Sequence, residues 1–239
     1  MMNSDNSSGH ISQRFDDELD AVKSQLTEMG GIVEKQVSDA IASLLDADAL
    51  LAEKVVKKDK SINTLEVSID EDCALILARR QPAARDLRLV LSIIKTTTDL
   101  ERIGDEADKM ATQAINLAEE GKAPHGYVEI RHIGQHVSKM LSQALDCFVR
   151  QDVELALRVA QEDKAVDLEY GTALRAMMTY MIEDPRSITR VMSIMWSLRA
   201  LERIGDHARN IAEHVIYLVK GDDVRHLGLK KMAEKVHET

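Results

Sequence analysis

Three carboxylates, Glu101, Asp105 and Asp108, recur at an i, i+4, i+7 spacing. On an α-helix this spacing places the three side chains in one row, within about 60° of each other. The row borders an apolar arc of the same segment, whereas Arg102 and Lys109 lie on the other side. An ordinary solvated helix surface would not place a row of acids beside a predicted buried face.

A second polar row, Asp59, Asn63 and Glu66, has the same spacing on the preceding predicted helix. If the two rows face each other, carboxylates about 4 Å apart repel by about 4 kcal/mol at an effective dielectric constant of about 20. Protonation, a neighbouring Lys or Arg, or a bound cation must offset this repulsion. Oxygen ligands favour Mg, Mn, Ca or iron over zinc. The rows predict a metal site, and the alternative is ordinary salt bridges with residues such as Lys60.

The acidic row of Glu101 belongs to a sequence that occurs twice. The segment LERIGDEADKMATQAI (100–115) returns as LERIGDHARNIAEHVI (201–216), 101 residues later, with nine of sixteen positions identical. Upstream, residues 52–63 match residues 156–167 at an offset of 104. One unit of about 100 residues is therefore duplicated. Recurrence of the acids in both copies favours the metal site over chance salt bridges.

The second copy keeps four acids at the corresponding positions, which are Asp163, Asp167, Glu202 and Asp206. It replaces the two others, because Tyr170 corresponds to Glu66 and Arg209 corresponds to Asp108. An arginine at this position could take the place of a cation.

Few residues can interrupt helices, since the chain has 11 Gly and 3 Pro among 239 residues. Helix breaks are expected near residues 46–48, 81–82, 121–124, 151–152, 184–185 and 221. The segments between them predict helices of about 25 to 38 residues, three in each copy. We therefore expect an all-α fold of two tandem three-helix bundles. The expected divisions are a disordered tail at 1–10, bundles at 11–122 and 123–222, and a C-terminal tail at 223–239.

Composition limits the classes of function. The 31 basic and 41 acidic residues give a net charge of −10, which argues against nucleic-acid binding. The longest apolar stretches, such as residues 87–94, are too short and too often interrupted to span a membrane. Cys73 and Cys147 form neither a disulfide framework nor a metal-ligand pair, and the first 30 residues lack a secretory signal. These features predict a cytoplasmic protein.

Histidines and glycines give weaker signals. His132 and His136 have an i, i+4 spacing that can hold a metal, but they are expected at the surface without an acidic row. His207 and His214 point away from Glu202 and are expected to be solvated.

Gly104 and Gly205 lie in the middle of predicted helices, on the apolar face. Because a glycine there costs about 1 kcal/mol relative to alanine, we expect close approach of a neighbouring helix at both positions.

Enzyme signatures are absent from the sequence. It contains no Gly-rich phosphate loop, no G-x-S-x-G motif, no kinase signature and no Glu-x-x-His motif next to the acids. We therefore expect a protein without catalytic activity. The alternative is a carboxylate-bridged metal hydrolase or oxidase that uses Glu101, Asp105 and Asp59 as ligands.

Five segments carry a resemblance to a known family, and this resemblance runs from about residue 11 to residue 224. They are FDDELDAVKSQL (15–26), MGGIVEKQVSDAI (29–41), ARRQPAARDLRLV (78–90) and both LERIGD motifs. In these segments the chain resembles the PhoU family of bacterial regulators of phosphate transport. The resemblance implies two tandem three-helix bundles.

The resemblance also implies a metal-binding Glu/Asp-x-x-x-Asp motif in each bundle, which holds iron or zinc in some relatives. The motif falls on Glu101-Asp105 and on Glu202-Asp206, with partner acids at Asp59 and at Asp163-Asp167. Asn63 departs from the pattern, and magnesium or manganese would then suffice. Mg, Mn, Fe and Zn are thus the expected metals.

The implied function is negative control of the phosphate-starvation response. A family member would act as an adaptor between the ATPase of the phosphate ABC transporter and the phosphate-sensing histidine kinase. It would lie at the membrane only through these partners. A homodimer is also expected.

Overall fold

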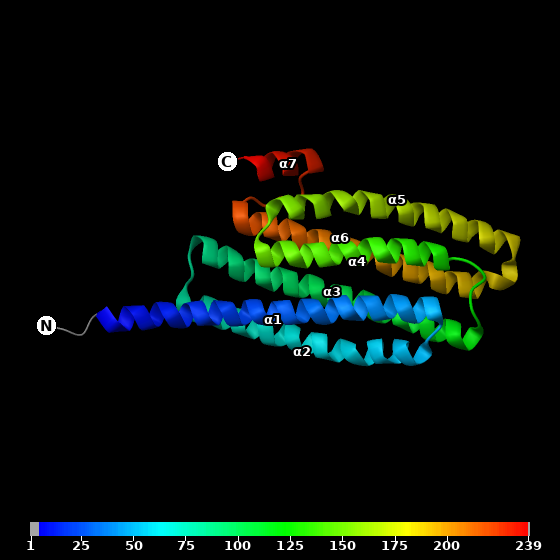
Figure 1. Ribbon diagram of the computed structural model, residues 1–239, viewed down its shortest axis with the longest axis horizontal. Helices are drawn as coiled ribbons and strands as arrows, with labels where there is room; N and C mark the ends of the chain where they lie inside the picture. The colour runs from blue at the N-terminus through cyan, green and yellow to red at the C-terminus, as the bar shows by residue number, and fades with distance from the viewer. Residues whose placement is uncertain (1–4, 239) are drawn as a thin grey trace.

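The computed structural model describes the backbone of residues 5–238 and the side chains of residues 13–238. The helices are α1 (Asp5–Asp46), α2 (Ala49–Arg80), α3 (Ala84–Glu120), α4 (Tyr127–Arg150), α5 (Val153–Glu183), the 3-10 turn η1 (Pro185–Ser187), α6 (Ile188–Lys220) and α7 (Leu229–His237). Figure 1 shows α1 to α3 side by side below α4 to α6. The predicted all-α fold of two three-helix bundles is confirmed, and residues 5–238 contain no strand.

The two copies of the repeat begin their second helices in the same way. The Asp48 carboxylate accepts a hydrogen bond from the Leu51 backbone N–H at 2.9 Å, and Asp152 accepts one from Leu155 at 2.9 Å. Such N-caps satisfy backbone donors that the first helical turn leaves free. The duplication therefore extends to the residues that start α2 and α5.

The first helices of the two bundles differ in length. Helix α1 has 42 residues, more than the expected range, whereas α4 has 24, at the lower end of that range. The linker 121–126 joins the end of α3 directly to the start of α4. Glycines at both ends of the linker adopt positive φ, 95° at Gly121 and 104° at Gly126. Only glycine takes up this conformation without strain.

Both predicted tails need correction. Helix α1 begins at Asp5, so residues 5–10 continue the helix, because adding turns costs far less than starting one. Residues 1–4 lie outside the described part of the chain. In the expected tail 223–239, α7 buries Met232 and Val236 against the second bundle. This i, i+4 apolar pair gives α7 a hydrophobic face, which explains why the segment is ordered.

One continuous hydrophobic core extends through both bundles. Helices α3 and α6 lie against each other at the centre of the molecule (Figure 1), and residues such as Leu100 and Leu201 are fully buried. Burial of one such side chain stabilises the fold by about 1.5 to 3 kcal/mol. Each of these helices therefore has two buried faces, one toward its own bundle and one toward the other bundle.

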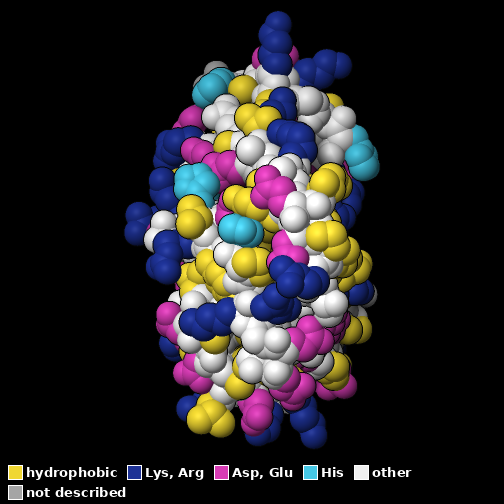
Figure 2. All heavy atoms as spheres, turned by 90° about the vertical axis from the view of Figure 1, so that its right-hand side faces the viewer, with side chains coloured by type: hydrophobic (Ala, Val, Ile, Leu, Met, Phe, Trp, Pro, Cys, Tyr) yellow, Lys and Arg dark blue, Asp and Glu magenta, His cyan; other side chains and the backbone are white. Residues whose placement is uncertain are grey.

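Among residues 5–238, no helix is long and apolar enough to cross a membrane. Figure 2 shows the end of the molecule that lies at the right in Figure 1. Basic, acidic and hydrophobic side chains are mixed there, and neither sign of charge dominates this end.

Candidate metal centres

In the first bundle, α2 and α3 bring the two predicted rows together. The Asp59 carboxylate is half-buried, and its Oδ2 accepts a hydrogen bond from Asn63 at 3.1 Å. Its Oδ1 is buried without a hydrogen-bond partner, which is costly for a charged oxygen. Burial raises the pKa of Glu101, and the charges of Asp105 and Asp59 add to this increase. Asp59 and Glu101 therefore share one side of the bundle.

The other acids of the first bundle belong to the same cluster. Burial raises the pKa of Glu66, with a further increase from Glu101, and burial together with Asp59 raises the pKa of Asp108. Asn63 is exposed at the edge of the cluster and contributes its amide to Asp59. Each raised pKa reports the free-energy cost of burying a charged carboxylate, to which the neighbouring like charges add. A bound cation would offset that cost.

Gly104 lets α3 approach this cluster. A Cβ atom at Gly104 would lie 3.1 Å from Ile62 Cδ1, 3.2 Å from Gln36 Oε1 and 3.6 Å from Asp59 Oδ1. The predicted close approach is confirmed here. At Gly205 a Cβ would meet its nearest neighbour, Val166, at 3.5 Å, an ordinary contact. The expected close approach at Gly205 is therefore wrong, because the side chains facing it leave room for a methyl group.

In the second bundle, α5 and α6 gather three of the predicted acids. One carboxylate oxygen from each of Asp163, Asp167 and Asp206 lies within 4.8 Å of the other two. Asp163 is buried, whereas Asp167 and Asp206 are exposed. The fourth acid, Glu202, is bound to Arg199 at 2.6 Å through one oxygen, and its other oxygen is buried without a partner. The four acids thus form a second cluster.

Arg209 lies at the edge of this second cluster. Its Nη1 donates to Asp163 Oδ2 at 2.9 Å, and its Nε donates to Glu213 Oε1 at 2.9 Å. Burial raises the pKa of Asp163, although Arg209 partly opposes this effect. The second bundle thus contains both a candidate cation site and a positive side chain bound to one of its ligands.

The structure corrects the expectation that His207 and His214 are solvated. His207 Nδ1 and His214 Nε2 donate to the two oxygens of Asp99 at 2.8 and 2.9 Å, and Asn210 donates to the same carboxylate at 3.1 Å. Asp99 lies on α3, so these bonds join the two bundles. The face of α6 away from the acids packs against α3 and not against water. The residue spacing within α6 could not predict these bonds, because Asp99 lies on another helix.

The expectation for the second histidine pair, His132 and His136, is corrected in part. His132 is exposed as expected, with 67% of its side chain accessible. His136 is half-buried between two acids of α5, Glu169 at 3.2 Å and Glu162 at 3.1 Å. Acidic residues do accompany this pair, but they come from the neighbouring helix, which the spacing on α4 does not reveal.

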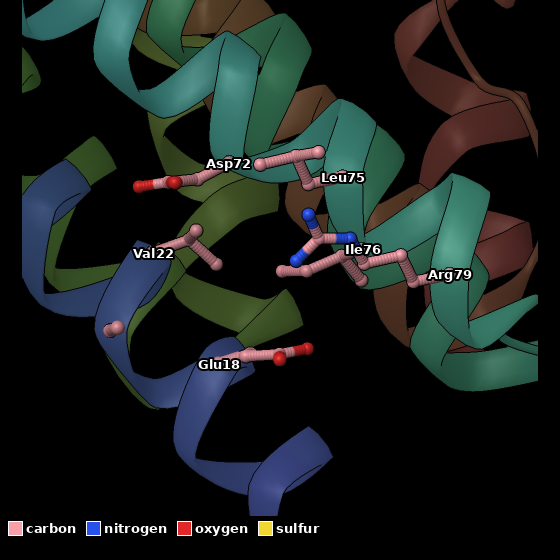
Figure 3. A pocket seen from close by; sticks show the side chains of 7 residues that line it. Glu18, Val22, Asp72, Leu75, Ile76 and Arg79 are labelled. Carbon is pink, nitrogen blue, oxygen red and sulfur yellow. The ribbon is translucent and has the colours of Figure 1, made fainter.

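A groove elsewhere on the molecule contains none of the predicted ligands. It lies between α1 and α2, has a volume of about 240 Å³ and is lined by Glu18, Val22, Asp72, Leu75, Ile76 and Arg79, with Ala21 (Figure 3). The Arg79 guanidinium extends into the space between the two helices. The candidate metal centres are therefore not part of this groove.

Comparison with known proteins agrees with the duplicated architecture. The PhoU domain matches the chain twice, at residues 26–114 and 130–215. The chain belongs to the PhoU family. Each matched region contains one of the two acidic clusters, so both clusters lie within PhoU domains.

Named relatives match nearly the whole length of the chain. It is 62% identical to the phosphate-specific transport system accessory protein PhoU homolog of Pseudomonas aeruginosa, over 99% of this chain and 98% of the relative. It is 46% identical to the PhoU accessory protein of Escherichia coli, over 95% of this chain and 94% of the relative.

Crystal structures of PhoU proteins show the same fold. The structure of PhoU from Pseudomonas aeruginosa has a TM-score of 0.86 and 63% identity, and covers 87% of this chain and 100% of that one. The PhoU regulatory protein from Streptococcus pneumoniae has a TM-score of 0.81 at 30% identity, over 88% of this chain and 99% of that one.

Proposed function

We propose that this chain is an accessory protein of a phosphate-specific transport system and represses the phosphate-starvation response when phosphate is sufficient. The observation that carries the proposal is the 62% identity to a relative named as a phosphate-specific transport system accessory protein, over nearly the full length of both chains. In this proposal the protein acts in the cytoplasm and has no catalytic activity. It reaches the membrane by docking on the transporter ATPase and the sensor histidine kinase, as a homodimer.

A deletion strain tests the regulatory part of this proposal. Without the protein, genes of the phosphate-starvation response should be expressed strongly in phosphate-rich medium, because the signal of sufficiency no longer reaches the kinase. A reporter fusion measures this, and the wild-type gene supplied on a plasmid should restore repression. Persistent repression in the deletion strain would contradict the proposal.

We further propose that each acidic cluster binds a divalent or trivalent cation. Glu101, Asp105, Asp108, Asp59, Asn63 and Glu66 would hold it in the first bundle, and Asp163, Asp167, Glu202 and Asp206 in the second. Their oxygens suit Mg, Mn or Fe, with Zn a poorer match. The buried, unbonded oxygens of Asp59 and Glu202 support this fit. The ion would supply positive charge that joins two helices.

Replacing Glu101 tests the first site. In metal-free protein, Glu101→Gln should raise the free energy of unfolding at neutral pH by about 1 kcal/mol, because it removes repulsion between like charges. The folded-state pKa of Glu101 is raised, so this group favours folding when protonated. That contribution is lost as pH rises through the folded-state pKa. The gain in the free energy of unfolding of Glu101→Gln over the wild type should therefore decrease toward acidic pH.

The same variant should bind less Mn²⁺, measured by equilibrium dialysis with elemental analysis. Glu71→Gln, an exposed acid on α2, is the matched control and should change neither stability nor binding. Wild-type protein without affinity for Mn²⁺ would reject the metal site and leave an electrostatic cluster of structural origin. Turnover of phosphoesters or peroxide that disappears in Glu101→Gln would instead favour the metal-enzyme alternative.

A further inference from the structure

Arg102 contacts Glu101 at 3.4 Å in the first acidic cluster, but at two other positions the clusters differ in positive charge. Arg209 contacts Asp163 in the second cluster, and the corresponding residue in the first is Asp108. Arg199 contacts Glu202, and its counterpart is Thr98. At these two positions the second bundle therefore has a base where the first has an acid or a neutral residue.

The contacts of Arg209 involve the most buried acids of the second bundle. The Asp163 side chain is 4% accessible and that of Glu213 is 3% accessible, and the guanidinium lies between them at 2.9 Å from each. Asp163 Oδ2 is thus occupied by a fixed cation of the protein itself. In the first bundle, the corresponding Asp59 receives a hydrogen bond from neutral Asn63, and its other oxygen is unbonded.

The surface beside Arg209 leaves room for this side chain to move. A polar groove of about 640 Å³ adjoins it, lined in part by Arg203, Asn210 and Arg225. Arg209 itself lines this groove and is 31% accessible. The guanidinium can therefore leave Asp163 and remain hydrated, while it keeps its bond to Glu213 within the same helix.

We propose that Arg209 is an internal counter-cation that competes with a metal ion for Asp163, so that the second bundle binds divalent cations more weakly than the first and releases Arg209 when it does. This inference rests on the proposed metal sites. A cation that binds at the second site must displace the charge-assisted hydrogen bond between Arg209 and Asp163. The occupancy of the second site is therefore the one that changes with cation concentration.

Mn²⁺ binding to the full chain tests the competition. In a Glu101→Gln/Asp105→Asn background, which disables the first site, Arg209→Gln should tighten Mn²⁺ binding by about tenfold or more, the range expected for one close charge pair. Arg209→Lys retains a cation and should stay near the background affinity. Arg203→Gln is the matched control, because Arg203 lies on the same helix but contacts Glu106 at 3.2 Å.

The reverse substitution keeps the test decisive if Arg209→Gln fails to fold. Relative to Asp108→Asn, which removes the same carboxylate without adding a cation, Asp108→Arg should weaken Mn²⁺ binding at the first site by a similar factor. Unchanged affinity in Arg209→Gln or in Asp108→Arg, while Asp163→Asn still abolishes binding at the second site, would overturn the competition and leave the metal sites standing. No Mn²⁺ binding by any variant or by the wild type would overturn both proposals.

Discussion

Replacing Asp99 with alanine should lower the free energy of unfolding by about 3 to 5 kcal/mol, the cost typical of removing one partner from a buried charged network. The Asp99 carboxylate is nearly buried and accepts three hydrogen bonds from α6, from His207, Asn210 and His214. Alanine would leave these donors without their acceptor at the contact between the bundles. Denaturant unfolding followed by circular dichroism measures the loss.

The effect should depend on pH in a defined direction. Burial alone would raise the pKa of Asp99, but the bonds from His207 and His214 outweigh it and hold the pKa below its usual value. A lowered folded-state pKa means that the carboxylate stabilises the fold above the unfolded-state pKa of about 4. This stabilisation is lost as pH falls through the folded-state pKa, so wild type and Asp99→Ala should converge in strong acid.

Asp20→Ala is the control for Asp99→Ala, since Asp20 forms an exposed ion pair with Lys23. Exposed pairs of this kind contribute about 0 to 1 kcal/mol, so the control should be nearly neutral. An Asp99 variant as stable as the Asp20 control would show that the histidine contacts do not hold the bundles together.

Gly126→Ala should destabilise the protein by about 3 kcal/mol, the sum of a strained backbone conformation and a steric clash. Gly126 precedes α4 with φ of 104°. Its added Cβ would collide with Ile194 Cγ2 and lie 3.1 Å from Met177 Sδ, and both side chains are fully buried. A β-branched isoleucine in the core cannot move aside as a surface side chain would.

Gly31→Ala is the matched control for this substitution. Gly31 lies within α1 on the surface, and its added Cβ would meet no atom within 4 Å. Alanine there should stabilise the helix by about 0.5 to 1 kcal/mol. Thermal unfolding should therefore move in opposite directions for the two variants. A Gly126 variant with unchanged melting temperature would contradict the packing of the linker against α6.

The helices and the carboxylate rows were predictable from local sequence patterns. Breaks at residues such as Gln81 and Gln151 follow from local chemistry, because helix propagation depends on neighbours within one or two turns. The i, i+4, i+7 spacing fixes which acids share a face, and the duplication showed that this face recurs. These features needed no knowledge of distant contacts.

The contacts made by the other faces of the helices depend on how the helices pack in three dimensions. The periodicity of α6 could not predict the hydrogen bond between His214 and Asp99, because it joins residues 115 positions apart in two different bundles. The same limit explains the errors at α7 and at Gly205. A pattern within one helix specifies which side chains point together, but the free energy of packing against another helix decides whether that face meets protein or water.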